Sequence, residues 1–139
     1  ADTPRSCRFY EELLGLRLGG DGVNSGIEQD HLDGLSDTQV RITGHRCPEG
    51  PGIECLNYLK PEGGRPLPAD QNSADSAHWQ IRLAVSDLEA ISSQLESYGG
   101  SWVSPGIVDL CGEQATAFGF SRALQIREPD GHQLQIVCS

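Results

Sequence analysis

Apolar and polar residues alternate strictly near the C-terminal end of the chain. Every second position is apolar over residues 124–127 and again over 133–136, and a Pro-Asp-Gly turn sequence lies between them at 129–131. Because successive side chains of a strand point to opposite faces, this pattern predicts two strands joined as a hairpin. A weaker copy over residues 40–58 predicts a second hairpin in the middle of the chain.

Apolar residues recur at helical spacing ahead of each predicted hairpin. Asp2 and Pro4 are typical of a helix start, and the apolar positions after them predict a helix that ends at Gly15. A second helix is predicted to begin at Asp87, with an apolar stripe formed by Leu88, Ile91, Leu95 and Tyr98. Strands are expected over residues 16–23, 39–46, 52–59, 79–85 and 101–108.

Three other segments show no clear period. Residues 24–37 predict a loop with a helical turn near 28–32, and the segment before Phe120 predicts another loop. The polar stretch 24–29 is either a pocket lid or an ordinary surface loop. Residues 61–78 are rich in Pro, Gly, Ser, Asp and Asn, which predicts a linker between two halves of one domain.

The two halves repeat one order of elements, which predicts an α+β fold of two tandem modules. Residues 79–139 read as strand-helix-strand-strand-strand, and residues 1–60 repeat this order without the opening strand. We expect that strand to lie before Ala1. In the overlay Glu54 falls on Gln135, so the copies differ at one polar position of their last strands. The whole of 1–139 is predicted to form a single domain.

Composition narrows the class of protein. The chain has 139 residues and a net charge of -10, which argues against nucleic acid and anionic membrane surfaces as partners. It has no apolar run of about 20 residues, the length needed to cross a bilayer. The five cysteines show no Cys-x-x-Cys spacing, which favours reduced thiols in a cytoplasmic protein; they are Cys7, Cys47, Cys55, Cys111 and Cys138.

Four segments carry a resemblance to a known family. They cover residues 9–16, 51–58, 78–88 and 128–136, and they occur in the order and spacing of a duplicated module. The tandem resembles the vicinal oxygen chelate superfamily, the glyoxalase, bleomycin-resistance and dioxygenase group. The resemblance implies modules whose curved sheets form a pocket on their concave faces, outer helices, and a homodimer that binds a small molecule.

The resemblance also implies where a metal would bind. Metal-dependent members place ligands on the first and last strand of each module, commonly His and Glu. These positions fall on Glu54, on Gln80 where His is usual, and on Gln135 where Glu is usual. A glutamine offers only a neutral oxygen, whereas Zn, Ni, Mn or Fe prefers imidazole or anionic ligands. We therefore expect no cofactor, although a divalent metal, Mg included, on these three residues stays an alternative.

Alternation along the strands defines a set of candidate ligand-binding residues. Period two places Gln80 beside Arg82 on one face, and Gln133 beside Gln135 on another strand. Such faces are often simply the wet side of an antiparallel sheet, but in this family they line a cavity. The candidates are Glu54, Tyr58, Gln80, Arg82, Arg127 and Gln135.

The histidines add little to this set. His78 shares a face with Gln80 if its strand extends that far, so it is either a ligand or base, or a residue at the edge of the linker. His132 is expected to be a surface turn residue. His31 and His45 have no neighbouring residues that suggest a partner.

Two functions remain open at this point. The first is a small-molecule-binding protein of the glyoxalase or bleomycin-resistance type, without the family's usual His/Glu catalytic metal site. The second is a glyoxalase-like metal-dependent lyase, isomerase or dioxygenase in which Glu54 is a ligand or a base. A structural or regulatory module that binds proteins is a third reading. The sequence leaves open whether the protein is an enzyme.

Overall fold

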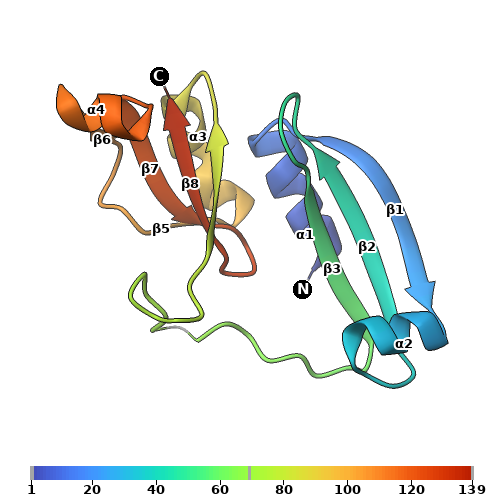
Figure 1. Ribbon diagram of the computed structural model, residues 1–139. Helices are drawn as coiled ribbons and strands as arrows, with labels where there is room; N and C mark the ends of the chain where they lie inside the picture. Colours follow the sequence, from blue (N-terminus) through green and yellow to red (C-terminus); the bar gives the residue numbers. More distant parts are fainter. Residues whose placement is uncertain (1, 69, 139) are drawn as a thin grey trace. The chain divides into compact units, whose positions relative to one another are not determined.

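The computed structural model describes residues 2–68 and 70–138. Two compact units divide between Pro66 and Leu67, a boundary that falls inside the stretch 61–78. Each unit holds one open sheet accompanied by helices, shown in Figure 1. The expected α+β class is confirmed.

The first unit begins with a helix and continues into a three-stranded sheet. Asp2 caps the first helix, because its Oδ1 accepts a hydrogen bond from Arg5 N at 3.2 Å. All pairs in the sheet are antiparallel, in the order β1-β2-β3. The elements are α1 (Thr3–Arg8), a π-helical segment (Phe9–Leu13), β1 (Arg17–Ser25), α2 (Ile27–Asp33), β2 (Gln39–Arg46) and β3 (Ile53–Lys60).

The α1 side of this sheet is its buried side. Odd-numbered residues of β2 and β3 point there, and Thr43, His45 and Ile53 are buried. The π-helical segment that follows α1 supplies Phe9 and Tyr10, whose rings meet edge to face. Burial of these side chains holds the helix against the sheet.

The helical turn expected near 28–32 is present as the helix α2, but the rest of 24–37 contains less loop than expected. β1 runs on to Ser25, and α2 fills most of the remainder. The helix shows no apolar period because it is mostly exposed, with Leu32 79% accessible. It is tied to the start of β2 by the Asp30 carboxylate, which accepts hydrogen bonds from Thr38 N at 2.7 Å and Asp37 N at 3.1 Å. The idea of a flexible lid over 24–29 is therefore replaced by a strand end and a helix.

The second unit follows the predicted strand-helix-strand-strand-strand order, except that one strand is divided into two and one helix is added. Its sheet has the order β4-β8-β7-β5, and β6 pairs with β7; β4 and β8 are parallel. The elements are β4 (Gln80–Ala84), α3 (Leu88–Gln94), a 3-10 turn (Leu95–Tyr98), β5 (Ser101–Trp102), β6 (Val108–Asp109), α4 (Glu113–Phe118), β7 (Arg122–Arg127) and β8 (Gln133–Cys138).

Two expectations for this unit need correction. The single strand expected over 101–108 is two short strands, because Ser104 Oγ accepts a hydrogen bond from Gln125 N where a ladder bond would form, and Pro105 has no N–H to donate. The loop expected before Phe120 contains α4, which has no buried residue and hence no apolar stripe. The predicted stripe of α3 is correct, because Leu88, Ile91 and Leu95 are buried.

The sheets of the two units share one order of strands. β3-β2-β1 in the first unit corresponds to β8-β7-β5 in the second. In the second unit β4 lies beside β8, whereas β3 is an edge strand among the described residues. The repeat inferred from the sequence is thus visible in the pairing of the strands.

The turn between β7 and β8 is organised by a buried carboxylate. Glu128 Oε1 accepts hydrogen bonds from His132 Nδ1 and His132 N, both at 2.9 Å, and from Asp130 N at 3.0 Å. Burial by itself would raise the pKa of Glu128, but these hydrogen bonds together outweigh it and lower that pKa. The carboxylate in turn raises the pKa of His132. His132 is therefore more than the surface turn residue expected from the sequence.

We predict that the stability contributed by this pair depends on pH in both directions. The contribution of Glu128 is lost as pH falls below about 4.5, its unperturbed pKa, because the folded pKa is lowered. The contribution of His132 is complete below about 6.5 and is lost as pH rises, because the folded pKa is raised. The substitution His132→Asn should lower the melting temperature by a few degrees between these values and by less at pH 8.

Thermal unfolding at pH 5.5 and pH 8 measures this difference. His31→Asn, on the exposed surface of α2, is the matched control. An equal loss of melting temperature at both pH values in His132→Asn would contradict the prediction.

Candidate functional site

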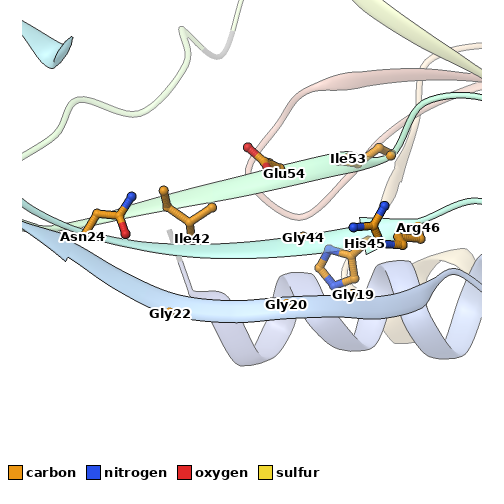
Figure 2. Close-up of a pocket in the computed structure, with 11 residues that line it drawn as sticks. Gly19, Gly20, Gly22, Asn24, Ile42, Gly44, His45, Arg46, Ile53 and Glu54 are labelled. Carbon is orange, nitrogen blue, oxygen red and sulfur yellow. The ribbon is translucent and has the colours of Figure 1, made fainter. Parts of the chain in front are cut away.

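An open hollow lies over one face of the sheet of the first unit. Its volume is about 710 Å³, which suits a small organic molecule. Figure 2 shows the hollow with all three strands contributing to it. The lining residues are Gly19, Gly20, Gly22, Asn24, Ile42, Gly44, His45, Arg46, Gly52, Ile53 and Glu54.

Glycines form the floor of the hollow. Gly20 pairs with Gly44 across β1 and β2, and Gly22 pairs with Ile42. A Cβ atom added at Gly20, Gly22 or Gly44 would meet no atom within 4 Å. Glycine within a strand weakens the strand, and it often marks a place where a ligand approaches the backbone closely. The floor therefore offers peptide groups directly to whatever occupies the hollow.

Two other glycines shape the rim. Gly52 is required by a close approach, because a Cβ atom there would lie 2.6 Å from the carbonyl oxygen of His45. Gly19 sits at the irregularity in the pairing of β1 with β2. The side chain of Arg46 crosses over it, with Nε 2.7 Å from where a Cβ would be. The missing side chain of Gly19 thus makes room for the guanidinium at the edge of the hollow.

Glu54 and Arg46 bring opposite charges to the hollow. Glu54 is the acidic residue among those that line it, and it pairs with Gly44 across the sheet. The side chains of Glu54 and Arg46 form no hydrogen bond or ion pair with any residue that the structure describes. Figure 2 shows the Glu54 carboxylate on one side of the sheet and the His45 ring on the opposite side. A ligand in the hollow would meet an unpaired anion and an unpaired cation.

Tyr58 shares the face of Glu54 but lies outside the lining of the hollow. It stands four positions further along β3, near α2. Burial raises the pKa of its phenol, and the neighbouring Asp33 of α2 adds to the rise. The structure therefore brings Tyr58 to the same face as Glu54 and places it beside Asp33 of α2, the helix at the expected helical turn.

The second unit carries a separate polar face. The register places Gln80 beside Gln133, Arg82 beside Gln135, and Gln125 opposite Gln135, so all five share one face. Arg82 Nε donates a hydrogen bond to Gln135 Oε1 at 2.7 Å, and Gln125 Nε2 donates one to Gln80 Oε1 at 3.0 Å. The guanidinium of Arg82 also lies 5.0 Å from the centre of the Phe120 ring. The shared face predicted for these strands is confirmed by the register.

Arg127 lies on the same face, but its guanidinium binds backbone. Nη1 donates to the carbonyl of Gly131 at 3.0 Å, and Nη2 donates to the carbonyl of Gln71. These bonds attach the segment before β4 to the β7–β8 turn. His78, in that segment, is half-buried and lies before the start of β4.

The amide oxygens of the two glutamines already accept hydrogen bonds. Gln135 Oε1 accepts from a guanidinium, so a positive charge stands where a cation would need to bind. Gln80 Oε1 accepts from another amide. This donor set fits an organic ligand with hydrogen-bonding groups better than it fits a divalent cation. The metal assignment to Glu54, Gln80 and Gln135 stays a prediction.

The sequence analysis missed one cluster. His45, which had no partner in that analysis, lies beside Glu11, with 3.3 Å between His45 Nε2 and Glu11 Oε1. Ligand atoms of Cys7, Glu11 and His45 all lie within 4.8 Å of one another. Two features of the sequence could have indicated this cluster. Cys7 and Glu11 are four residues apart on a predicted helix, so they share one face of it, and the position of His45 along its strand determines which face of the sheet it is on.

Comparison with known proteins identifies the family. The sequence model of the Glyoxalase/Bleomycin resistance protein/Dioxygenase superfamily matches residues 1–136. The chain belongs to this superfamily. A search of curated proteins gives no significant match. The resemblance carried by the four sequence segments is thereby confirmed.

Solved structures of the superfamily have the same fold. A glyoxalase family protein of Bacillus cereus is 22% identical, with a TM-score of 0.70 over 91% of this chain and 80% of its own. A glyoxylase/bleomycin resistance protein/dioxygenase domain from Frankia is 18% identical, with a TM-score of 0.64 over 99% and 89%. The trypanothione-dependent glyoxalase I of Leishmania major is 17% identical, with a TM-score of 0.54 over 99% and 78%. At these identities the similarity concerns the fold.

We predict that the rim of the hollow tolerates no side chain at Gly52. The substitution Gly52→Ala should lower the free energy of unfolding by about 1–3 kcal/mol, because the new methyl group would collide with the backbone carbonyl of His45. Gly44→Ala is the matched control, since its Cβ would enter open space. Urea unfolding of both variants tests this, and equal stabilities would contradict it.

Proposed function

We propose that this superfamily member is a small-molecule-binding protein of the glyoxalase and bleomycin-resistance type. Its ligand would lie in the hollow over the β1-β2-β3 sheet, without the usual His/Glu catalytic metal. One observation carries the proposal: a hollow of about 710 Å³ combines a glycine floor with the unpaired charges of Glu54 and Arg46.

The lining indicates the chemistry of the ligand. The carboxylate of Glu54 would accept hydrogen bonds from hydroxyl or ammonium groups, and Arg46 would bind a carboxylate or phosphate. Asn24 supplies an amide, and Ile42 supplies the apolar contact. These groups favour a polar organic molecule that carries both donors and an anionic group.

The polar face of the second unit supports the same class of function. Arg82 is exposed, and its hydrogen bond to Gln135 fixes the orientation of the guanidinium. The remaining N–H groups of this guanidinium therefore point in set directions. Gln80 and Gln125 add amide groups nearby on this face. We propose Gln80, Arg82 and Gln135 as ligand-binding residues, together with Tyr58. Arg127 is proposed in a supporting role, because it binds backbone carbonyls.

The second candidate is a glyoxalase-like metal-dependent lyase, isomerase or dioxygenase. It is favoured by the position of Glu54, which is the unpaired carboxylate of the hollow and the family's usual closing ligand. The hydrogen bonds that Gln80 and Gln135 already accept weigh against it. The name of the Leishmania structure, a glyoxalase I, describes an enzyme built on the same fold.

We also propose that the protein is a cytoplasmic homodimer. The odd number of cysteines and the lack of Cys-x-x-Cys spacing support a reducing compartment. Among the residues that the structure describes, the helices are too short and too polar to cross a membrane. The dimer rests on the family resemblance, and the measured mass in solution tests it.

We predict that filling the hollow abolishes ligand binding and leaves the fold intact. Gly44→Val places a branched side chain in open space on a strand that favours such residues. Glu54→Gln removes the charge while keeping the shape. A thermal-shift screen with bleomycin and a panel of small polar metabolites finds ligands, and titration calorimetry measures them. Each variant should weaken binding at least about tenfold, the loss expected for one charged hydrogen bond.

Matched controls are Gly64→Val and Glu62→Gln, which follow β3 near the end of the first unit and do not line the hollow; the added Cβ at Gly64 also meets no atom within 4 Å. Both should bind as the unchanged protein does. Ligands that bind Gly44→Val and Glu54→Gln with full affinity would contradict a site in the hollow.

We predict that Glu54→Gln leaves the metal content of the purified protein unchanged. Elemental analysis of the unchanged protein and the variant checks this. Loss of a stoichiometric metal in Glu54→Gln would sink the metal-free proposal and favour the enzyme. Because this comparison removes one carboxylate, a metal bound elsewhere in the chain does not confuse it.

A further inference from the structure

Three side chains with metal-binding atoms meet on the α1 side of the first sheet. Cys7 comes from α1, Glu11 from the π-helical segment that follows it, and His45 from β2. Their ligand atoms lie within 4.8 Å of one another. Glu54 lies on the other face of the same sheet, as Figure 2 shows for Glu54 and His45. The ligand atoms of the cluster therefore lie on the opposite face from the Glu54 carboxylate, although His45 is also among the residues that line the hollow, and the cluster shares no residue with the metal positions that the family resemblance implies.

The His45 ring is buried without hydrogen bonds. Its side chain has no exposed surface, and neither Nδ1 nor Nε2 has a hydrogen-bond partner among the described residues. Nε2 lies 3.3 Å from Glu11 Oε1, but the approach lacks the geometry of a hydrogen bond. A buried polar atom that lacks a hydrogen-bond partner destabilises the fold. An ion bound at Nε2 would remove this penalty.

The local structure holds the three groups together. Cys7 and Glu11 are four residues apart, so they lie on one face of the helix, and that face meets β2. The wider π-helical turn begins between them, at Phe9, and such turns are frequent at functional sites. Tyr10 packs against the His45 ring, with 5.4 Å between ring centres, and limits its rotation.

We propose that Cys7, Glu11 and His45 bind a Zn²⁺ ion. A thiolate, an imidazole and a carboxylate form the set of donors that zinc prefers, and Mg²⁺ does not. Two donors with bonds of about 2.0–2.1 Å to a tetrahedral ion lie about 3.3 Å apart, which matches the separation of His45 Nε2 from Glu11 Oε1. The Glu11 side chain is 33% exposed, so water can reach the fourth position.

Binding requires one proton to leave. The Cys7 thiol loses its proton to solvent, and the thiolate sulfur donates an electron pair to the ion; nothing is oxidised or reduced. Burial raises the pKa of this thiol, and the nearby Glu11 carboxylate adds to the rise. Metal binding should therefore weaken at acidic pH. The bound ion would tie the first helix to β2 and make the stability of the first unit depend on zinc.

The experiment starts with the protein after treatment with a chelator. Titration calorimetry with Zn²⁺ should show one site per chain, and Mg²⁺ should show none. Co²⁺, used as a spectroscopic substitute, should give the near-ultraviolet charge-transfer band of a thiolate ligand. Cys7→Ser and Glu11→Gln should weaken zinc binding at least about tenfold, since even indirect partners of ligands contribute that much. The cobalt band should vanish in Cys7→Ser.

Matched controls change the same residue types outside the cluster. They are Cys111→Ser, Glu12→Gln and His31→Asn, all exposed positions. Each control should keep the affinity for zinc and the cobalt band. Zinc should also raise the melting temperature of the unchanged chain but not of Cys7→Ser. His45→Asn removes the buried ligand, and if it fails to fold, Cys7→Ser still decides the outcome.

Three results would overturn the proposal. These are the absence of zinc binding by the unchanged chain, a cobalt band that persists in Cys7→Ser, and a band that disappears in Cys111→Ser instead. Glu54→Gln should bind zinc normally, because its carboxylate lies on the opposite face. A failure of this zinc site is therefore distinguishable from a failure of the ligand site in the hollow.

Discussion

The packing of the first helix against one face of the β1-β2-β3 sheet decides which side chains of that sheet remain available. Phe9 and Tyr10 cover the odd-numbered positions of β2 and β3. Gly44 and Glu54, at even-numbered positions, are left on the open face. A shift of either strand by one residue would exchange the two sets. The hollow and the buried Cys7 cluster are thus two outcomes of a single register.

The second unit applies the same division with a different result. Its apolar face packs Leu134 and Ile136 near α3, and its polar face carries Arg82 and Gln135. Here the polar groups bind each other, whereas Glu54 and Arg46 of the first unit do not. The two modules share one strand order, but they differ in whether the polar side chains of the open face bind one another. A preorganised amide and guanidinium pair on one sheet contrasts with unpaired charges on the other.

Much of the fold could be predicted because alternation and helix starts are local signals. The stripe at Leu88, Ile91 and Leu95 and the final hairpin are correct for that reason. α4 escaped prediction, and α2 was expected only as a helical turn, because the two helices bury almost nothing and so show no apolar period. For the site, alternation along the strand placed Gln80 and Arg82 on one face, and the overlay of the two halves singled out Glu54. The proximity of Cys7 to His45 depends on how the helix packs against the sheet, and alternation along a strand carries no information about that packing.

The glycine floor has a consequence for how selectivity could be changed. The peptide groups of this surface remain whatever side chain is substituted, so a substitution can only cover them. Gly20, Gly22 and Gly44 each lead into open space, so side chains of increasing size at these positions would narrow the hollow in graded steps. Selectivity for ligand size would then be an adjustable property of three adjacent positions, largely independent of the core on the other side of the sheet.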